Sequence, residues 1–175
     1  SSGLGGGSSD ATFMLIALNN LFNLKLNIKQ LIQYASLIGS DCPFFIFNTF
    51  SSVSGFGHKI KPIPFSLRNY HIVIINPNIQ CSTKEIFSYY EVAQNIKHFS
   101  PIDSSIDSWS KKLVNDLEKV SFSLHPELYT IKDYLYSSGA IYASMSGSGS
   151  SVYGLFKKDP HITAFRDYWI WNSIL

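Results

Sequence analysis

Charged residues and cysteines are both scarce in this sequence of 175 residues. Charged residues make up 15% and the net charge is +2, which argues against a dedicated nucleic-acid binder, because such proteins usually carry a clustered basic face. The two cysteines, Cys42 and Cys81, cannot form a disulfide scaffold and fit a reducing compartment. No apolar run approaches the ~18 residues of a transmembrane helix, and no signal peptide is visible. We therefore expect a cytoplasmic protein without a nucleic-acid or membrane partner.

Apolar residues, by contrast, are abundant, with 45% hydrophobic and 15% aromatic residues. This content excludes intrinsic disorder, because enough apolar surface exists to offset the entropy of the chain. Strand patterns alternate with helical patterns along the sequence, which predicts an α+β or α/β fold. Pro62, Pro64 and a polar stretch mark a boundary near Ser66, so we expect one domain over residues 1–66 and another over residues 67–175.

Local patterns predict the main elements of both domains. In the first domain, apolar spacing predicts a helix over Ala11–Phe22 that is buried on most sides and capped within Ser8–Asp10. A second helix is expected over Ile28–Ile38, and the apolar run Phe44–Phe47 predicts a short strand. For the second domain, we expect strands at Tyr70–Ile75, Tyr142–Met145, Val152–Phe156 and Tyr168–Ile174, and helices at Ser82–Tyr90, Ser108–Val120, Pro126–Ser137 and near Ile162.

The sequence begins in a glycine-rich loop, Gly3–Ser9, that leads into the first helix. Glycines let backbone N–H groups turn inward, and a helix N-terminus adds unpaired donors, so this loop suits phosphates. It lacks the ending of a Walker A loop and the full glycine pattern of a dinucleotide-binding loop. A flexible linker or tight turn is the alternative. Because no methionine and no strand precede the loop, we expect a C-terminal fragment of a longer protein.

Three further features could carry chemistry. Asp41 stands between a helix end and an apolar segment, where partial desolvation would make it a plausible base; from spacing alone, an Asp that stabilises the turn is the better interpretation. Ser146–Ser150 alternates serine and glycine, which fits either an anion-contacting turn close to the first loop or a tight hairpin. Phe87, on a short helix, could be a core residue or stack on a base. The histidines are scattered without metal-ligand spacing.

In combination, Gly3–Ala11, Ala17–Asn19, Gly39–Phe45 and Ser146–Gly149 resemble the motifs of the kinase superfamily of galactokinase, homoserine kinase, mevalonate kinase and phosphomevalonate kinase. The first and third segments are most similar to the branch that serves non-mevalonate isoprenoid biosynthesis. This resemblance implies a two-domain small-molecule kinase fold, in which the remainder of an ATP-binding domain precedes a ferredoxin-like α/β sandwich. It implies ATP-dependent phosphorylation of a hydroxyl of 4-diphosphocytidyl-2-C-methyl-D-erythritol, assisted by Mg²⁺. A sister kinase of homoserine or mevalonate, or a non-catalytic nucleotide-binding domain, is the alternative.

The resemblance also implies roles for individual residues. Asp41 matches the catalytic aspartate that accepts the proton of the substrate hydroxyl, and Thr83 and Phe87 match a segment that lines the cytidine pocket. The loop that binds the ATP phosphates would comprise Ser1, Ser2, Gly3, Leu4, Gly5, Gly6, Gly7, Ser8 and Ser9. Ser146–Ser150 matches a further loop of the family, called the third loop below, which would bring Gly147, Ser148 and Gly149 to the substrate. The family's segment with a catalytic lysine and adenine contacts has no counterpart in this sequence, so we expect little kinase activity from the fragment alone. Metal ligands and oligomeric state stay open.

Overall fold

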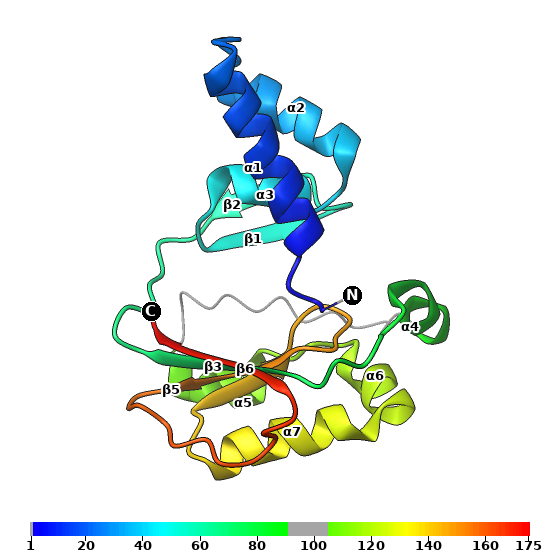
Figure 1. Ribbon diagram of the computed structural model, residues 1–175, viewed down its shortest axis with the longest axis vertical. Helices are drawn as coiled ribbons and strands as arrows, with labels where there is room; N and C mark the ends of the chain where they lie inside the picture. The colour runs from blue at the N-terminus through cyan, green and yellow to red at the C-terminus, as the bar shows by residue number, and fades with distance from the viewer. Residues whose placement is uncertain (1, 91–104) are drawn as a thin grey trace. The chain divides into compact units, whose positions relative to one another are not determined.

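The computed structural model of the protein describes residues 2–90 and 105–175 (Figure 1). Its contacts divide the chain into two compact units. We call Gly5–Ser66 the helical unit, and Leu67–Leu175 together with the segment that ends at Leu4 the sheet unit. Helices accompany antiparallel strands in both units, so the predicted α+β class is confirmed. In the described ranges, no helix combines the length and apolar character needed to cross a bilayer.

The helical unit consists of helices followed by a hairpin. In chain order these are α1 (Gly6–Leu21), α2 (Ile28–Ile38), α3 (Cys42–Phe47), β1 (Ser51–Ser54) and β2 (Lys59–Pro62). The start of α2 is a capping box, in which Asn27 Oδ1 accepts the Gln30 N–H and Gln30 Oε1 accepts the Asn27 N–H. This exchange satisfies two N–H groups that a helix end otherwise leaves unpaired.

The strand expected at Phe44–Phe47 is wrong, because this run lies in α3. Pro43 occupies the first turn of that helix, where its fixed φ suits a helix and its missing N–H removes no hydrogen bond. A short apolar run cannot by itself distinguish a strand from a helix. The proline one position earlier was the local signal that favoured a helix.

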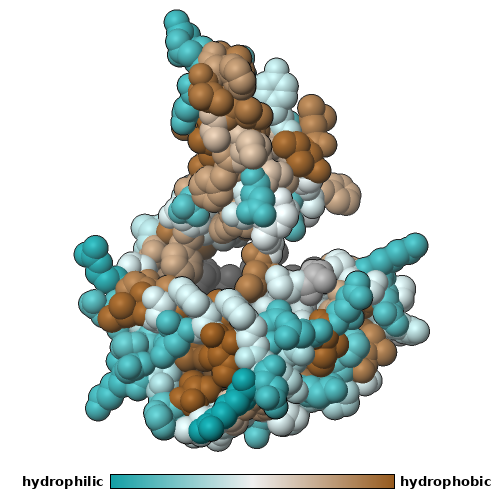
Figure 2. All heavy atoms as spheres, viewed as in Figure 1, coloured by the Kyte–Doolittle hydropathy of each residue, from teal (hydrophilic) through white to brown (hydrophobic). Residues whose placement is uncertain are grey.

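The first helix also differs from the expected one. α1 begins at Gly6 with Gly5 as its N-cap, so the expected caps within Ser8–Asp10 lie inside the helix. The expected burial on most sides is wrong, since Thr12 is the buried residue of α1 and Leu21 is 76% exposed. Figure 2 shows apolar side chains on the surface of these helices. Apolar composition favours burial, but α2 and α3 cover only part of the helix circumference.

The sheet unit is built on a four-stranded antiparallel sheet in the order β4-β5-β3-β6. Its elements are β3 (His71–Asn76), α4 (Thr83–Tyr89), the 3₁₀ helix η2 (Ile106–Ser108), α5 (Trp109–Lys112), α6 (Glu118–Leu124), α7 (Pro126–Ser137), β4 (Tyr142–Met145), β5 (Val152–Phe156) and β6 (Trp169–Ile174). The register pairs Ile74 with Tyr153 of β5 and with Trp171 of β6.

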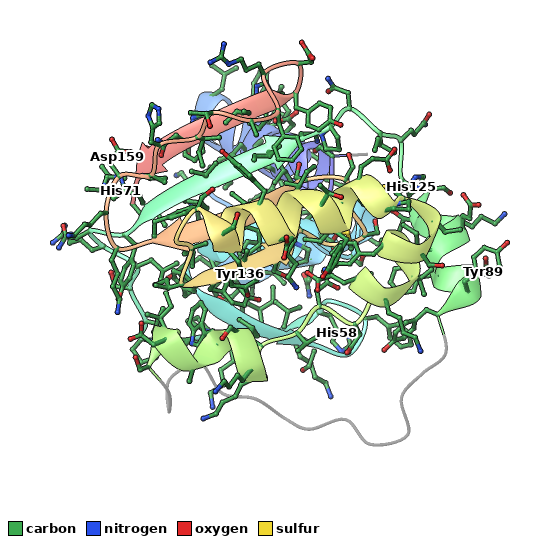
Figure 3. All side chains as sticks on the ribbon, turned by 90° about the horizontal axis from the view of Figure 1, so that it is seen from below. His58, His71, Tyr89, His125, Tyr136 and Asp159 are labelled. Atoms are coloured by element: carbon green, nitrogen blue, oxygen red, sulfur yellow. The ribbon has the colours of Figure 1, made fainter. Side chains whose placement is uncertain are left out.

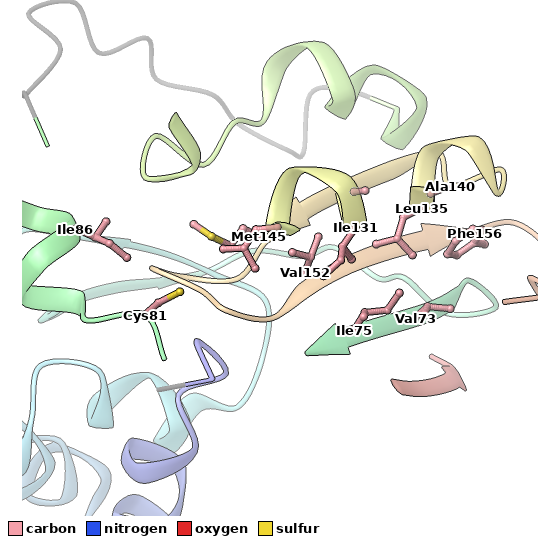
Figure 4. Close-up of a cluster of buried hydrophobic side chains, with 12 residues drawn as sticks. Val73, Ile75, Cys81, Ile86, Ile131, Leu135, Ala140, Met145, Val152 and Phe156 are labelled. Carbon is pink, nitrogen blue, oxygen red and sulfur yellow. The ribbon is translucent and has the colours of Figure 1, made fainter. Parts of the chain in front are cut away.

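The core of the sheet unit lies between the sheet and α7, which packs on β4 and β5 (Figure 4). Alternate strand residues point into it, as the period of two requires. The buried cluster contains Val73, Ile75, Cys81, Ile86, Leu128, Ile131, Leu135, Ala140, Ala143, Met145, Val152 and Phe156. On the other face of β4, the Tyr142 ring makes edge-on contacts with Trp109 of α5 and with Tyr153.

A continuous helix over Ser108–Val120 is not formed, because η2, α5 and α6 are separate pieces. The break is centred on Asn115, whose Oδ1 accepts the Leu117 N–H at 3.0 Å. Asparagine side chains compete in this way with helical hydrogen bonds. The helix expected near Ile162 is also absent from this described part of the chain.

Candidate functional site

The start of the glycine-rich loop lies against the Ser146–Ser150 loop, within the sheet unit. Ser146 Oγ donates to the Gly3 carbonyl at 2.8 Å, and the Ser151 N–H donates to the Ser2 carbonyl at 3.1 Å. Gly3 has a φ of +74°, and a Cβ there would stand 2.2 Å from the Ser146 carbonyl oxygen. Only glycine permits this approach. The Ser146–Ser150 turn therefore lies close to the first loop, as one of its two interpretations expected.

The rest of the glycine-rich loop belongs to the helical unit and forms the N-terminus of α1. The N-cap Gly5 has a φ of +66°, and no side chain caps the helix. A Cβ on Gly6 or Gly7 would meet no atom within 4 Å. The first N–H groups of α1 thus lack intrahelical acceptors in uncrowded space, which suits an anion. The remaining loop residues are Leu4 in the sheet unit, Ser8 and Ser9 in α1, and Ser1, which lies outside the described residues.

Asp41 immediately precedes α3 in the helical unit, and its side chain is exposed. The expected partial desolvation is therefore not observed. Its Oδ1 accepts the Ser40 hydroxyl at 3.4 Å, but the carboxylate does not cap α3. The Asp41 carbonyl accepts the Phe44 N–H at 3.2 Å, so Asp41 takes part in the turn through its backbone, while the carboxylate bonds Ser40 alone among the described residues.

Two contacts fix α3 against the beginning of α1. The Thr12 hydroxyl, which is fully buried, donates to the Cys42 carbonyl at 2.8 Å. At the other end, a Cβ on Gly5 would stand 3.1 Å from the Phe45 ring. Thr12 lies about 9 Å along the axis from the start of α1. Asp41, adjacent to Cys42, is therefore held beside the first two turns of the helix whose N-terminus is open.

In the sheet unit, the start of α4 contacts the Ser146–Ser150 loop. The hydroxyls of Thr83 and Ser148 are 2.9 Å apart and share a hydrogen bond. A Cβ on Gly149 would stand 3.3 Å from Cys81 Sγ, and the φ of Gly149 is +94°. Burial raises the pKa of the Cys81 thiol, which keeps it protonated. The predicted residues of α4 and of the third loop thus lie together in the sheet unit, with Thr83 and Gly147 exposed and Ser148 and Gly149 buried.

Phe87 lies one turn further along α4 and is 55% exposed. Ile86, at 1% exposure, is the residue that anchors α4 in the core. The Phe87 ring makes an edge-on contact with Tyr90, with centroids 6.4 Å apart. The core interpretation of Phe87 is therefore wrong, and its ring is available to a planar partner.

The side chains that hold the third loop lie outside the motifs that the sequence predicted. Asn115 Nδ2 donates to the Met145 and Gly147 carbonyls at 2.9 and 2.8 Å. Glu118 Oε1 accepts the Met145 N–H at 2.8 Å. Neither residue belongs to a recognisable motif. The available signal was weak: Glu118 is an acidic residue in a segment expected to be helix, and an acidic side chain requires a partner only where it is buried.

The histidines among the described residues do not gather at either loop. Figure 3 shows His71 beside Asp159, with 3.7 Å between Nδ1 and Oδ1, while His125 precedes α7. Within the part of the chain that the structure describes, no three His, Cys, Asp or Glu side chains could together hold a metal ion.

The sheet unit also has a hollow of about 1060 Å³ between the end of α4 and the helices α6 and α7. Its lining includes Tyr90, Phe122, Tyr129 and Lys132. None of the predicted site residues lines this hollow. We therefore place the candidate site at the loops and not at the hollow.

Two family models match the chain. The model described as the GHMP kinases N terminal domain matches residues 1–49, and the model described as GHMP kinases C terminal matches residues 93–170. Both matches include segments on which the predicted resemblance rested, the glycine-rich loop in one and Ser146–Gly149 in the other. The chain therefore belongs to the GHMP kinases, and the resemblance is confirmed.

Particular relatives are similar over most of the chain. A 4-diphosphocytidyl-2-C-methyl-D-erythritol kinase from Azobacteroides pseudotrichonymphae genomovar. CFP2 is 50% identical over 158 residues, covering 89% of this chain and 59% of the relative. A kinase of the same name from Parabacteroides distasonis is 41% identical over 179 residues, covering 99% of this chain and 65% of the relative. The chain thus spans less than two thirds of the length of either relative.

A solved structure agrees with these relatives. The crystal structure of a 4-(cytidine 5'-diphospho)-2C-methyl-D-erythritol kinase has a TM-score of 0.72 and 28% identity, covering 88% of this chain and 57% of that one. Its match supports the expected small-molecule kinase fold.

Proposed function

We propose that this chain is part of an ATP-dependent kinase that phosphorylates a hydroxyl of 4-diphosphocytidyl-2-C-methyl-D-erythritol for isoprenoid precursor synthesis. The main support is the 50% identity, over 89% of the chain, to a kinase named for that substrate. The described geometry is compatible with the proposal, because it offers an uncapped helix N-terminus for phosphates and an exposed carboxylate in the same unit. In this assignment, the expected domain of residues 1–66 supplies part of the ATP-binding domain and residues 67–175 the substrate side, although the contacts group the segment that ends at Leu4 with residues 67–175.

The proposed chemistry is transfer of the γ-phosphoryl group. N–H groups at the start of α1 bind phosphate oxygens of ATP, together with the loop residues before them. Asp41 accepts the proton of the substrate hydroxyl as its oxygen attacks the γ-phosphorus, and the bond from that phosphorus to the β-phosphate oxygen breaks to release ADP. Its exposure and its freedom from capping α3 favour this role, because a base must reach the reacting hydroxyl.

The acceptor would be held by the sheet unit. Phe87 presents an exposed ring that can stack on cytosine. Thr83 and the third loop, through Gly147, Ser148 and Gly149, would contact the rest of the substrate. The hydrogen bond between the Thr83 and Ser148 hydroxyls supports a shared role, since one ligand could contact both.

Mg²⁺ would accompany ATP and offset the charge of its phosphates. The described residues fit this only in part, because they contain no carboxylate cluster. Mg²⁺ in such sites is bound chiefly by substrate phosphates, water and one or two carboxylates, so a cluster is not required. Both cysteines are free thiols, which is compatible with the proposed cytoplasmic location.

The test is ADP release by the full-length protein that the gene encodes, with the diphosphocytidyl substrate, homoserine or mevalonate as acceptor. We expect turnover with the first alone. Asp41→Asn should lower kcat by about 10²–10⁴ while ATP affinity stays unchanged, because a general base contributes about that factor. Asp133→Asn, the same change at an exposed residue of α7, is the control and should have no effect. Equal activity on homoserine would refute the assigned acceptor.

A second assay concerns the 175-residue chain itself. We propose that it has little kinase activity, because the family's lysine and adenine contacts have no counterpart in it. Robust ADP release by this chain with the diphosphocytidyl acceptor would overturn that expectation without affecting the proposed substrate.

A further inference from the structure

A buried carboxylate lies behind the third loop. The Glu118 side chain is 8% exposed and forms an ion pair with Lys132 of α7, with 2.5 Å between Oε2 and Nζ. Its other oxygen, Oε1, accepts the Met145 N–H at 2.8 Å and the Ser144 hydroxyl at 3.0 Å. Removing a carboxylate from water is costly unless such partners compensate. This pair therefore depends on the exact position of the backbone at Met145.

Asn115 binds carbonyl groups of the same stretch of backbone, whereas Glu118 binds an N–H group. Its Nδ2 donates to the Met145 carbonyl at 2.9 Å and to the Gly147 carbonyl at 2.8 Å. The amide and the carbonyl of Met145 are thus both bound by side chains. Since Gly147 and Gly149 both have positive φ, the loop has few intrinsic restraints, and external bonds must define its shape.

The restraint reaches the contacts of the loop with α4 and with the glycine-rich loop. Ser148 follows directly after the bound segment and shares its hydroxyl with Thr83. Ser146, one residue beyond Met145, donates to the Gly3 carbonyl. A shift at Met145 would therefore displace the hydroxyls that face α4 and the glycine-rich loop.

We propose that the Glu118–Lys132 ion pair, together with Asn115, positions the Ser146–Ser150 loop for the acceptor substrate. This inference rests on the proposed function. The three side chains are positioning residues, since the bonds described here join them to the loop backbone and to one another. The charge on Glu118 matters because charge-assisted hydrogen bonds are shorter and stronger than neutral ones.

The test uses the full-length protein and three variants. Lys132→Met leaves Glu118 buried without its cation, and we expect the KM for the acceptor to rise about tenfold while the KM for ATP is unchanged, because a bond to a charged group is worth at least that factor. The double variant Glu118→Gln with Lys132→Met removes both charges but keeps an oxygen acceptor for the Met145 N–H. The KM of this double variant for the acceptor should return most of the way to the wild-type value. Lys119→Met, at an exposed position of α6, is the control.

A purely structural role predicts a different pattern. Partial unfolding would lower kcat through the fraction of active enzyme and leave both KM values unchanged. That result, or a double variant worse than Lys132→Met, would overturn the proposal. If Lys132→Met does not fold, the double variant still decides, because the part of the acceptor KM that it does not recover is a rise over wild type. No rise, or an equal rise in the KM for ATP, would overturn the proposal.

Amide hydrogen exchange separates this inference from the proposed function. Lys132→Met should accelerate exchange about tenfold or more in the peptide 145–151 and leave β3 unchanged, because a lost bond to a charged group lowers the local opening energy. Unchanged exchange in that peptide refutes the positioning role even in an active kinase. Wild-type protein without activity on the diphosphocytidyl acceptor refutes the proposed function, while accelerated exchange would still show that the ion pair holds the loop.

Discussion

The two units bury their apolar residues to different extents. In the sheet unit, Val73, Ile75 and Ile131 are each 0% exposed, and strands and helices far apart in sequence enclose them. In the helical unit, α1 and α2 leave Leu21 76% and Leu37 83% exposed. Both units are folded from apolar sequence, so composition alone does not account for the difference. It follows from the number of elements that pack around each helix.

This difference assigns different sources of stability to the units. A closed core stabilises through apolar area removed from water, at about 25 cal/mol per Å². The helical unit has less of this area and relies more on particular bonds, such as those of Thr12 and of the capping box at Asn27. All three tryptophans, Trp109, Trp169 and Trp171, belong to the sheet unit, so their fluorescence reports on that unit alone.

The largest expected effect is in the closed core. Ile131→Ala should lower the free energy of unfolding of the sheet unit by about 2–5 kcal/mol, because it leaves a cavity in a packed interior. Leu37→Ala, at an 83% exposed position, should change stability by no more than about 0.5 kcal/mol. Urea unfolding of the 175-residue chain, followed by tryptophan fluorescence and by far-ultraviolet circular dichroism, measures both. Equal losses at the two positions would contradict the comparison.

A smaller effect is expected in the helical unit. Thr12→Val removes the buried hydroxyl that bonds the Cys42 carbonyl while keeping a similar volume. We expect a loss of about 0.5–1.5 kcal/mol, the net value of one such hydrogen bond. Circular dichroism should detect the earlier transition, and tryptophan fluorescence should not shift. Thr130→Val, at an exposed position of α7, is the matched control. A fluorescence shift as large as the dichroism shift would indicate that the units unfold together.

The same contrast explains what the sequence could predict. The bounds of α2 and α7 matched the expected ones, because local signals such as Gly39 and Pro126 mark those ends. The glycine-rich loop was visible because its composition is unusual. The bonds of Glu118 were not, because its partner Met145 lies 27 residues away and no local pattern specifies that pairing.

The apolar surface of the helical unit offers a third test. Leu21→Lys combined with Leu37→Lys should reduce the binding of a dye specific for exposed apolar surface by about half, because both are strongly exposed apolar side chains of this unit. Stability should change by no more than about 0.5 kcal/mol per substitution. Ile174→Lys, at a 60% exposed position of the sheet unit, is the control and should leave dye binding unchanged. An equal reduction with the control would mean that the dye does not distinguish the units.

The smallest expected effect is a pH dependence confined to the sheet unit. Burial opposes ionisation of Tyr134. Its oxygen, however, accepts hydrogen bonds from the N–H groups of Ala164 and Thr163, and these bonds lower its pKa to about 8. An unfolded tyrosine titrates near pH ~10. Between these values the unfolded chain holds the proton more tightly, so stability should rise with pH from about 8 to about 10. The contribution is fully present above that range and is lost as the pH falls through about 8.

Tyr134→Phe should remove this rise, and Tyr129→Phe, at an exposed position of the same helix, should preserve it. The effect is expected to be small, because solvent screens a group that is only partly buried. The urea midpoint from tryptophan fluorescence, measured between pH 7 and 10 in ~0.1 M salt, reports it. An unchanged slope in Tyr134→Phe would mean that the two N–H donors do not stabilise the phenolate, and that the loop carrying them is held to α7 by packing alone.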